Sequence, residues 1–93
     1  MQVHQDESDL IQRAKACDPD ALSTLYERYY QGIYRYVYYR VGSSALAEDL
    51  TADVFVKMLH GIHSYSQQGV PFSAWLYRIA RNRVIDHMRR QPD

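Results

Sequence analysis

Apolar residues recur at three- or four-residue spacing along most of this chain, and that periodicity limits it to helical folds. No segment alternates between apolar and polar residues beside a hairpin turn, and no internal repeat is present. The length of 93 residues suits one small domain with a single core. We therefore expect an all-α fold, a compact bundle of three main helices plus a short N-terminal helix.

Local start and stop signals divide the chain into these helices. The dipeptide Asp18-Pro19 is a strong start signal, because the Asp can accept a hydrogen bond from a backbone amide and the Pro suits the first helical position. Gly42 is a plausible C-terminal glycine, Ser43-Ser44 offers the next N-cap, and Ser8 is the expected N-cap of the first helix. The signals predict helices over about 9–16, 19–41 and up to about residue 60, a loop over 60–70, and a last helix from Pro71.

The formal net charge of zero hides a change of sign at Pro71. Residues 1–70 carry six Lys or Arg against nine Asp or Glu, a net of minus three, whereas residues 71–93 carry five Arg against two Asp, a net of plus three. A helical projection of the last segment separates its apolar stripe from a polar face that consists of Arg78, Arg81, Asn82 and Arg89. Arg83 and Arg90 fall elsewhere, beside Asp86, where we expect spaced ion pairs.

Nothing in the residue pattern indicates an enzyme or a metal-binding protein. The chain has no nucleophile-base pattern, no pocket-forming pair of carboxylates and no glycine-rich phosphate loop. His60 and His63 have no Cys or further His nearby, so we expect no metal and no cofactor. Cys17 is the single cysteine, and neither a signal peptide nor a long apolar run is present, which favours a cytoplasmic protein without membrane contact.

Two separated stretches carry a family resemblance. Residues 47–57 read AEDLTADVFVK, residues 72–82 read FSAWLYRIARN, and residues 86–90 read DHMRR. Together they closely resemble region 2 of the extracytoplasmic function (ECF) sigma factors of bacterial RNA polymerase, and the likeness extends from about Ser8 to Arg90. The resemblance implies one sigma region 2 domain over residues 1–93, without the second helical domain that binds the minus-thirty-five element in full family members.

The resemblance also implies two partners for this domain. In that family, region 2 docks on the clamp coiled coil of the largest subunit of RNA polymerase, and an acidic helix suits an arginine-rich partner. The expected polymerase-binding residues are Glu48, Asp49, Asp53 and Lys57. The family also captures the non-template strand of the minus-ten promoter element, with an extruded base held by the loop before the last helix. The expected DNA-binding residues are His63, Ser64, Tyr65 and Gln67 of the loop, and Arg78, Arg81, Asn82 and Arg89 of the helix.

Several alternatives stay open at the level of the sequence. Tyr65 can equally pack inward in an ordinary turn, whereas Trp75 sits in the middle of its apolar stripe and is expected in the core. Glu48 and Asp49 can simply complement the helix dipole. The chain can also be a regulator that binds duplex DNA, or a protein-binding adaptor whose basic helix meets an acidic partner. Whether an anti-sigma factor masks these surfaces is left open as well.

Overall fold

The computed structural model describes residues 3–66 and 69–90, with side chains described from Glu7 onward. Within these ranges the chain forms four α-helices, one short 3-10 turn and no strand. The elements are α1 (Val3–Lys15), α2 (Pro19–Val41), α3 (Ser44–Gly61), η1 (Ile62–Ser64) and α4 (Phe72–Arg90). The prediction of an all-α fold is therefore confirmed for the described residues.

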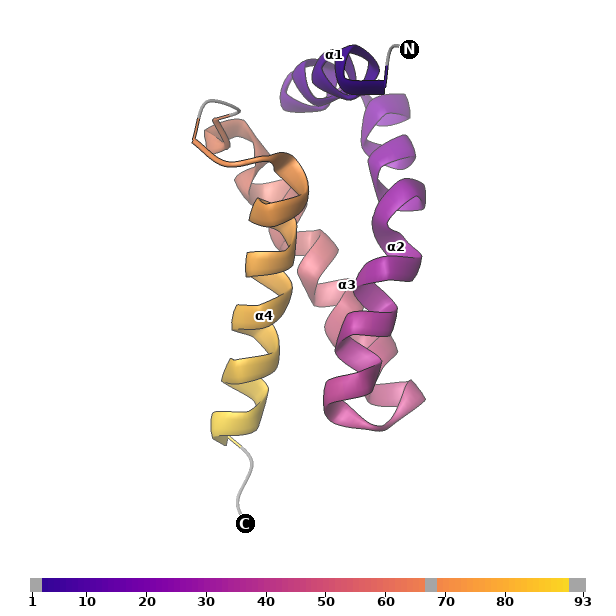
Figure 1. The fold of residues 1–93 in the computed structure, drawn as a ribbon, viewed down its shortest axis with the longest axis vertical. Helices are drawn as coiled ribbons and strands as arrows, with labels where there is room; N and C mark the ends of the chain where they lie inside the picture. The colour runs from indigo at the N-terminus through magenta and orange to yellow at the C-terminus, as the bar shows by residue number, and fades with distance from the viewer. Residues whose placement is uncertain (1–2, 67–68, 91–93) are drawn as a thin grey trace.

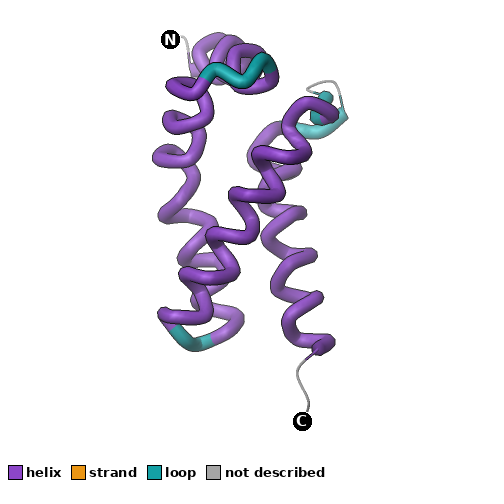
Figure 2. Tube along the Cα trace, turned by 180° about the vertical axis from the view of Figure 1, so that it is seen from behind, coloured by secondary structure: helices purple, strands orange, loops and turns teal. Residues whose placement is uncertain are grey.

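Three long helices form the body of the domain, and α1 crosses one end of it (Figure 1). Helix α3 packs against both α2 and α4, and α2 also contacts α4. Helix α1 contacts α2 and η1. The connection from α1 to α2 and the loop before α4 lie at the same end, whereas the turn from α2 to α3 lies at the other (Figure 2). None of the described helices combines the length and apolar character that a membrane span requires.

The helix boundaries follow the local signals closely. The Asp18 side chain accepts a hydrogen bond from the Asp20 amide at 3.0 Å, and α2 covers the predicted residues 19–41. Gly42 adopts a left-handed conformation with φ of 75°, which costs glycine little, and its amide donates to Tyr38 O. The Ser43 hydroxyl then caps α3 by accepting from the Leu46 amide at 3.2 Å. These caps explain why the second and third helices could be placed from the sequence.

The first helix is longer than predicted. It begins at Val3 rather than near Asp9, so Ser8 lies inside α1 and is not its N-cap. One long-range contact reaches the first half of this helix: the Tyr29 hydroxyl of α2 donates to the Glu7 carboxylate at 2.5 Å. Burial first, and then this hydrogen bond, raise the pKa of Tyr29 well above its usual range, so the phenol keeps the proton that it donates. The contact ties the first half of α1 to α2.

Each of the four helices contributes one face to the hydrophobic core. Arg40 of α2 is exposed, and its guanidinium carbon lies 3.7 Å from the centre of the Tyr36 ring. Tyr26 of the same helix is 44% exposed. The side chains that are buried at the centre of the bundle are Leu10, Ile11 and Ala14 of α1, Leu25, Ile33 and Val37 of α2, Leu50, Val54 and Met58 of α3, and Leu76, Ala80 and Val84 of α4.

Trp75 packs where α4 begins. Its ring centre lies 5.1 Å from that of Tyr65 and 5.6 Å from that of Phe72. The ring also covers Gly61 at the end of α3, where a Cβ atom would approach it to 3.3 Å. Trp75 is half-buried and packs against the buried core, so the prediction of a core position is met in part.

Replacing Trp75 with Ala should therefore lower the free energy of unfolding by about 3 kcal/mol, because the substitution empties the centre of this ring cluster. Urea denaturation followed by circular dichroism measures this change. Ile85→Ala removes an apolar side chain from the exposed side of the same helix and should cost less than about 1 kcal/mol. Equal losses in the two variants would contradict the placement of Trp75.

Candidate functional site

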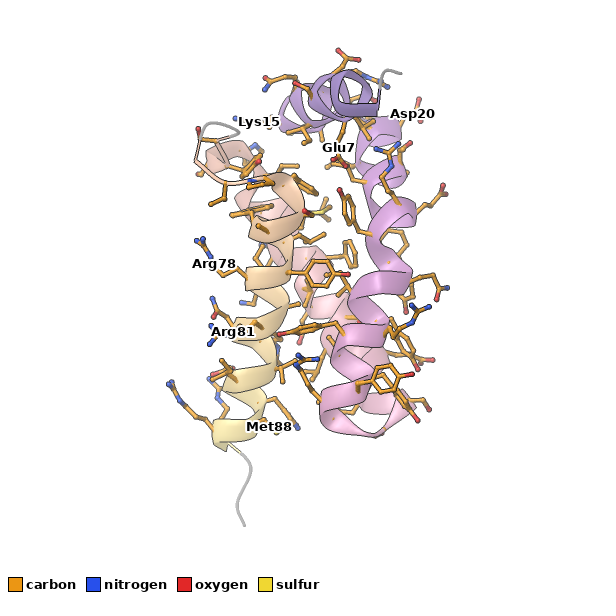
Figure 3. The ribbon with its side chains drawn as sticks, viewed as in Figure 1. Glu7, Lys15, Asp20, Arg78, Arg81 and Met88 are labelled. Atoms are coloured by element: carbon orange, nitrogen blue, oxygen red, sulfur yellow. The ribbon has the colours of Figure 1, made fainter. Side chains whose placement is uncertain are left out.

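The outer face of α4 carries the predicted basic and amide side chains. Arg78, Arg81, Asn82 and Arg89 are all exposed, opposite the buried stripe that contains Leu76. Figure 3 shows Arg78 and Arg81 projecting from α4 on the side away from α2. The sequence thus predicted correctly which side of the last helix faces solvent. This outer face of α4, defined by those four residues, is a surface of exposed hydrogen-bond donors with no carboxylate among them.

A polar groove of about 390 Å³ runs beside this face, between α3 and α4. Lys57 of α3 lines it on one side, and Asn82 and Arg83 of α4 line it together with Ile79 and Asp86. Asn82 therefore borders both the outer face of α4 and the groove. Lys57, which the sequence grouped with the acidic residues of α3, therefore lines the same groove as the amide of Asn82.

Ion pairs involve two of the residues that line the groove, Arg83 and Asp86. Arg83 lies 3.0 Å from the Asp53 carboxylate of α3 and 3.6 Å from Asp86 on its own helix, and Arg90 lies 3.5 Å from Asp86. The two pairs within α4 match the expected spacing. The pair between Arg83 and Asp53 was missed, because the two residues are 30 positions apart and meet only through the packing of α3 against α4.

The acidic residues of α3 divide into two groups. Glu48 and Asp49 are exposed on its second turn, where both carboxylates face solvent. Asp53, one turn further along, is turned toward α4 and is engaged by Arg83. The predicted patch therefore exists as an exposed pair of carboxylates, with a third carboxylate that already has an intramolecular partner.

The loop before α4 differs from the prediction at its aromatic residue. His63 and Ser64 are exposed, but Tyr65 is only 4% exposed and packs against Phe72 and Trp75. Its hydroxyl donates to Val70 O at 2.6 Å, which satisfies the polar end of the ring. The expectation that the Tyr65 ring stacks on a base is corrected accordingly: in this structure the residue is part of the core.

One further contact involves this loop. The Lys15 ammonium of α1 donates to Tyr65 O at 2.5 Å, so the end of α1 holds the backbone of the loop in place (Figure 3).

Gln67, the remaining loop residue of the predicted site, lies outside the described residues. Among the residues that the structure describes, no three His, Cys, Asp or Glu side chains come close enough to hold a metal ion.

An apolar surface between α2 and α3 was not assigned from the sequence. A groove of about 330 Å³ opens there, and the exposed rings and side chains of Tyr26 and Leu59 stand at its edge. Tyr26 also begins a row of stacked or tilted rings at four-residue spacing that continues through Tyr30, Tyr34 and Tyr38. That spacing is visible in the sequence, and it was the signal that could have located this surface.

The fold and these surfaces define an all-helical domain in which one helix exposes carboxylates and a neighbouring helix exposes arginines and an amide. Residues 25–92 match the Sigma-70 region 2 family, and the chain therefore belongs to that family. It is 48% identical over 81 residues to the ECF RNA polymerase sigma factor BldN of Streptomyces coelicolor, and 36% identical over 84 residues to the ECF RNA polymerase sigma factor SigW of Bacillus subtilis.

These relatives are longer than the chain. The alignment with BldN covers 87% of this chain and 31% of BldN, and that with SigW covers 89% of this chain and 44% of SigW. A solved structure of a complex between RsbN and BldN contains a similar fold, with a TM-score of 0.78 and 47% sequence identity over 85% of this chain and 57% of that one. The chain is thus a homologue of region 2 of ECF sigma factors and spans less than half the length of these two curated relatives.

Unfolding experiments can test whether the Tyr65 ring lies in the core. Replacing Tyr65 with Ala should lower the free energy of unfolding by about 3 to 5 kcal/mol, as for other buried aromatic side chains. Ser64→Ala, at the exposed neighbouring position, should change it by less than about 0.5 kcal/mol. Thermal unfolding of both variants measures the difference, and a Tyr65→Ala protein as stable as the parent would show that the ring is not a core residue.

Proposed function

We propose that this domain joins RNA polymerase core to a melted promoter by capturing the non-template strand of the minus-ten element. The observation that carries the proposal is the juxtaposition of the outer face of α4 with the groove that holds Lys57 and Asn82. Membership of the Sigma-70 region 2 family supports it independently. The domain is proposed to act by binding alone and to catalyse no reaction.

The chemistry of the α4 surface suits an unpaired strand. Arginine guanidinium groups bind phosphates in a bidentate manner and stack on bases, and the Asn82 amide can donate to and accept from a base edge at once. Bases become available for such contacts only when they are unstacked from a duplex. Opening a few base pairs costs several kcal/mol, and stacking contributes about 1 to 3 kcal/mol for each captured base. Several contacts together, with help from the polymerase, can therefore offset the cost of melting.

Because Tyr65 lies in the core, the loop is proposed to bind the extruded base through residues other than Tyr65. His63 and Ser64 are exposed and can offer ring, hydroxyl and backbone groups to an extruded base. Lys57 of α3 and Asn82 of α4 supply a cation and an amide from the two sides of the groove. The proposed base-binding site therefore relies on groups that read a base edge rather than on a tyrosine ring from the loop.

The exposed carboxylates of α3 are the proposed contact with polymerase. Glu48 and Asp49 can form charge-assisted hydrogen bonds to arginines of a partner helix, and the family resemblance points to the clamp of the largest subunit. The similar solved chain, BldN, was found in a complex with RsbN. A second protein that masks one of these surfaces is accordingly a reasonable partner for this chain as well.

Binding of duplex DNA is the main alternative function. The α3–α4 connection occupies residues 62–71, whereas a helix-turn-helix motif uses a turn of about 3 to 4 residues. The net charge of zero is also unlike that of most duplex binders. Tighter binding of the duplex than of the single strand would favour this alternative. A protein adaptor, the second alternative, would bind neither form in the presence of core polymerase.

Arg78→Ala and Asn82→Ala should each weaken binding of a minus-ten non-template oligonucleotide to the polymerase complex by about 1 to 3 kcal/mol. Their unfolding temperatures should stay close to that of the parent chain, because both side chains are exposed. Fluorescence anisotropy with labelled oligonucleotides measures the affinity. Arg35→Ala, which removes an exposed cation from α2, serves as the control and should leave the affinity unchanged. A loss as large in that variant would point to net charge alone.

Asp49→Arg should weaken the affinity for core polymerase by at least tenfold, because it places a cation where the partner is proposed to present arginines (about 1.4 kcal/mol or more). The base preference of the resulting complex should not change. Titration of labelled chain with core polymerase measures the first effect. Asp9→Arg on α1 makes the same charge reversal at the far end of the domain and should bind normally. Unchanged binding by Asp49→Arg would count against α3 as the docking helix.

A further inference from the structure

Arg83 is the most enclosed cation of the groove. Its side chain is 22% exposed, and both Nε and Nη2 lie 3.0 Å from the same oxygen of Asp53, Oδ2. Its third nitrogen, Nη1, lies 3.6 Å from Asp86 Oδ2. All three nitrogens of the guanidinium therefore face carboxylate oxygens.

Arg83 nevertheless occupies a position suited to a DNA phosphate. It lines the groove that contains Lys57 and Asn82, and it also lines an adjoining depression of about 420 Å³ that includes Lys57, His60 and Arg90. Lys57, Arg83 and Arg90 give this region three permanent positive charges, against two negative charges on Asp53 and Asp86. Carboxylate and phosphate oxygens are equivalent partners for a guanidinium, so Asp53 competes with any phosphate for Arg83.

The Asp53 carboxylate is also accessible to solvent. Its side chain is 49% exposed, and Oδ2 is the oxygen that contacts Arg83. It lies one helical turn beyond Asp49, on the helix that carries the exposed carboxylates. A cation that docks on Asp49 is therefore within about one helical turn, 5 to 6 Å, of the Asp53 carboxylate.

We infer that Asp53 couples the two proposed binding surfaces by exchanging partners. In the free chain Asp53 neutralises Arg83 and weakens strand binding. When a basic partner helix docks on α3, Asp53 pairs with that partner, and Nε and Nη2 of Arg83 become available for a backbone phosphate of the captured strand. The coupling rests on the proposed function, and by linkage a bound strand should tighten polymerase binding by the same factor. Asp53 and Arg83 are thus positioning residues that connect polymerase docking with strand capture.

A purely structural ion pair predicts a different result. If the contact only fastens α3 to α4, removing the Asp53 charge should lower stability and leave the strand affinity of the free chain unchanged. The exchange of partners predicts that the same substitution raises that affinity. Strand binding by the free chain therefore separates the two roles.

The test uses Asp53→Asn in the 93-residue chain and a fluorescent single-stranded minus-ten oligonucleotide. The free variant should bind about three- to fivefold more tightly than the parent, the scale set by one partly exposed ion pair. The slope of log affinity against log salt should steepen by about 0.7, as expected for one further phosphate contact on a single strand. Adding Arg83→Gln to Asp53→Asn should abolish both changes.

Asp49→Asn controls for the general effect of losing one carboxylate from α3, and its gain should stay under about twofold because Asp49 does not contact Arg83. Asp86→Asn leaves α3 unchanged and removes the second carboxylate from Arg83 together with the partner of Arg90, so it should also raise the affinity. An equal gain in Asp49→Asn, or no gain in either Asp53→Asn or Asp86→Asn, would overturn the inference.

The same measurement with core polymerase present completes the test. The parent and Asp53→Asn should then bind the strand within about twofold of each other, because docking has already released Arg83 in the parent. A gain that persists unchanged in the complex would overturn the exchange of partners. If the parent complex captures the strand but the free variants show no gain, only the coupling fails. If the parent complex captures no strand at all, the proposed function itself fails.

Discussion

The packing of α4 against α2 and α3 is the interaction on which the rest of the structure depends. Leu76 and Ala80 are fully buried in this contact. Because an α-helix repeats every 3.6 residues, burying that stripe also fixes the direction of every other side chain on the helix. The outer face of α4 then points to solvent, and Arg83 points toward α3. One hydrophobic contact thus arranges the core, the proposed strand-binding face and the ion-paired groove together.

This arrangement explains how a chain with no formal net charge can offer surfaces of opposite sign. The exposed carboxylates lie on the second turn of α3, and the exposed arginines follow one side of α4. The two helices are direct neighbours, and the groove lined by Lys57 and Asn82 lies between them.

Much of this organisation could be predicted from local sequence signals, and the rest required contacts between distant residues. Asp18, Gly42 and Ser43 marked the helix boundaries, since caps act within a few residues of the chain. The orientation of Tyr65 depends on rings that follow it on α4, and Glu7 of α1 contacts Tyr29, which lies 22 residues further along the chain. The periodicity of one helix could not reveal either contact, because neither is encoded within a single helix.

The position of Trp75 has a spectroscopic consequence. It is the only tryptophan of the chain, and its ring lies between the end of α3, the buried Tyr65 and the first turn of α4. Tyrosine emission overlaps indole absorption, so excitation of the neighbouring phenols passes largely to this one fluorophore. The domain therefore carries an intrinsic optical reporter directly beneath the loop, and its emission can follow rearrangement of that loop without an added label.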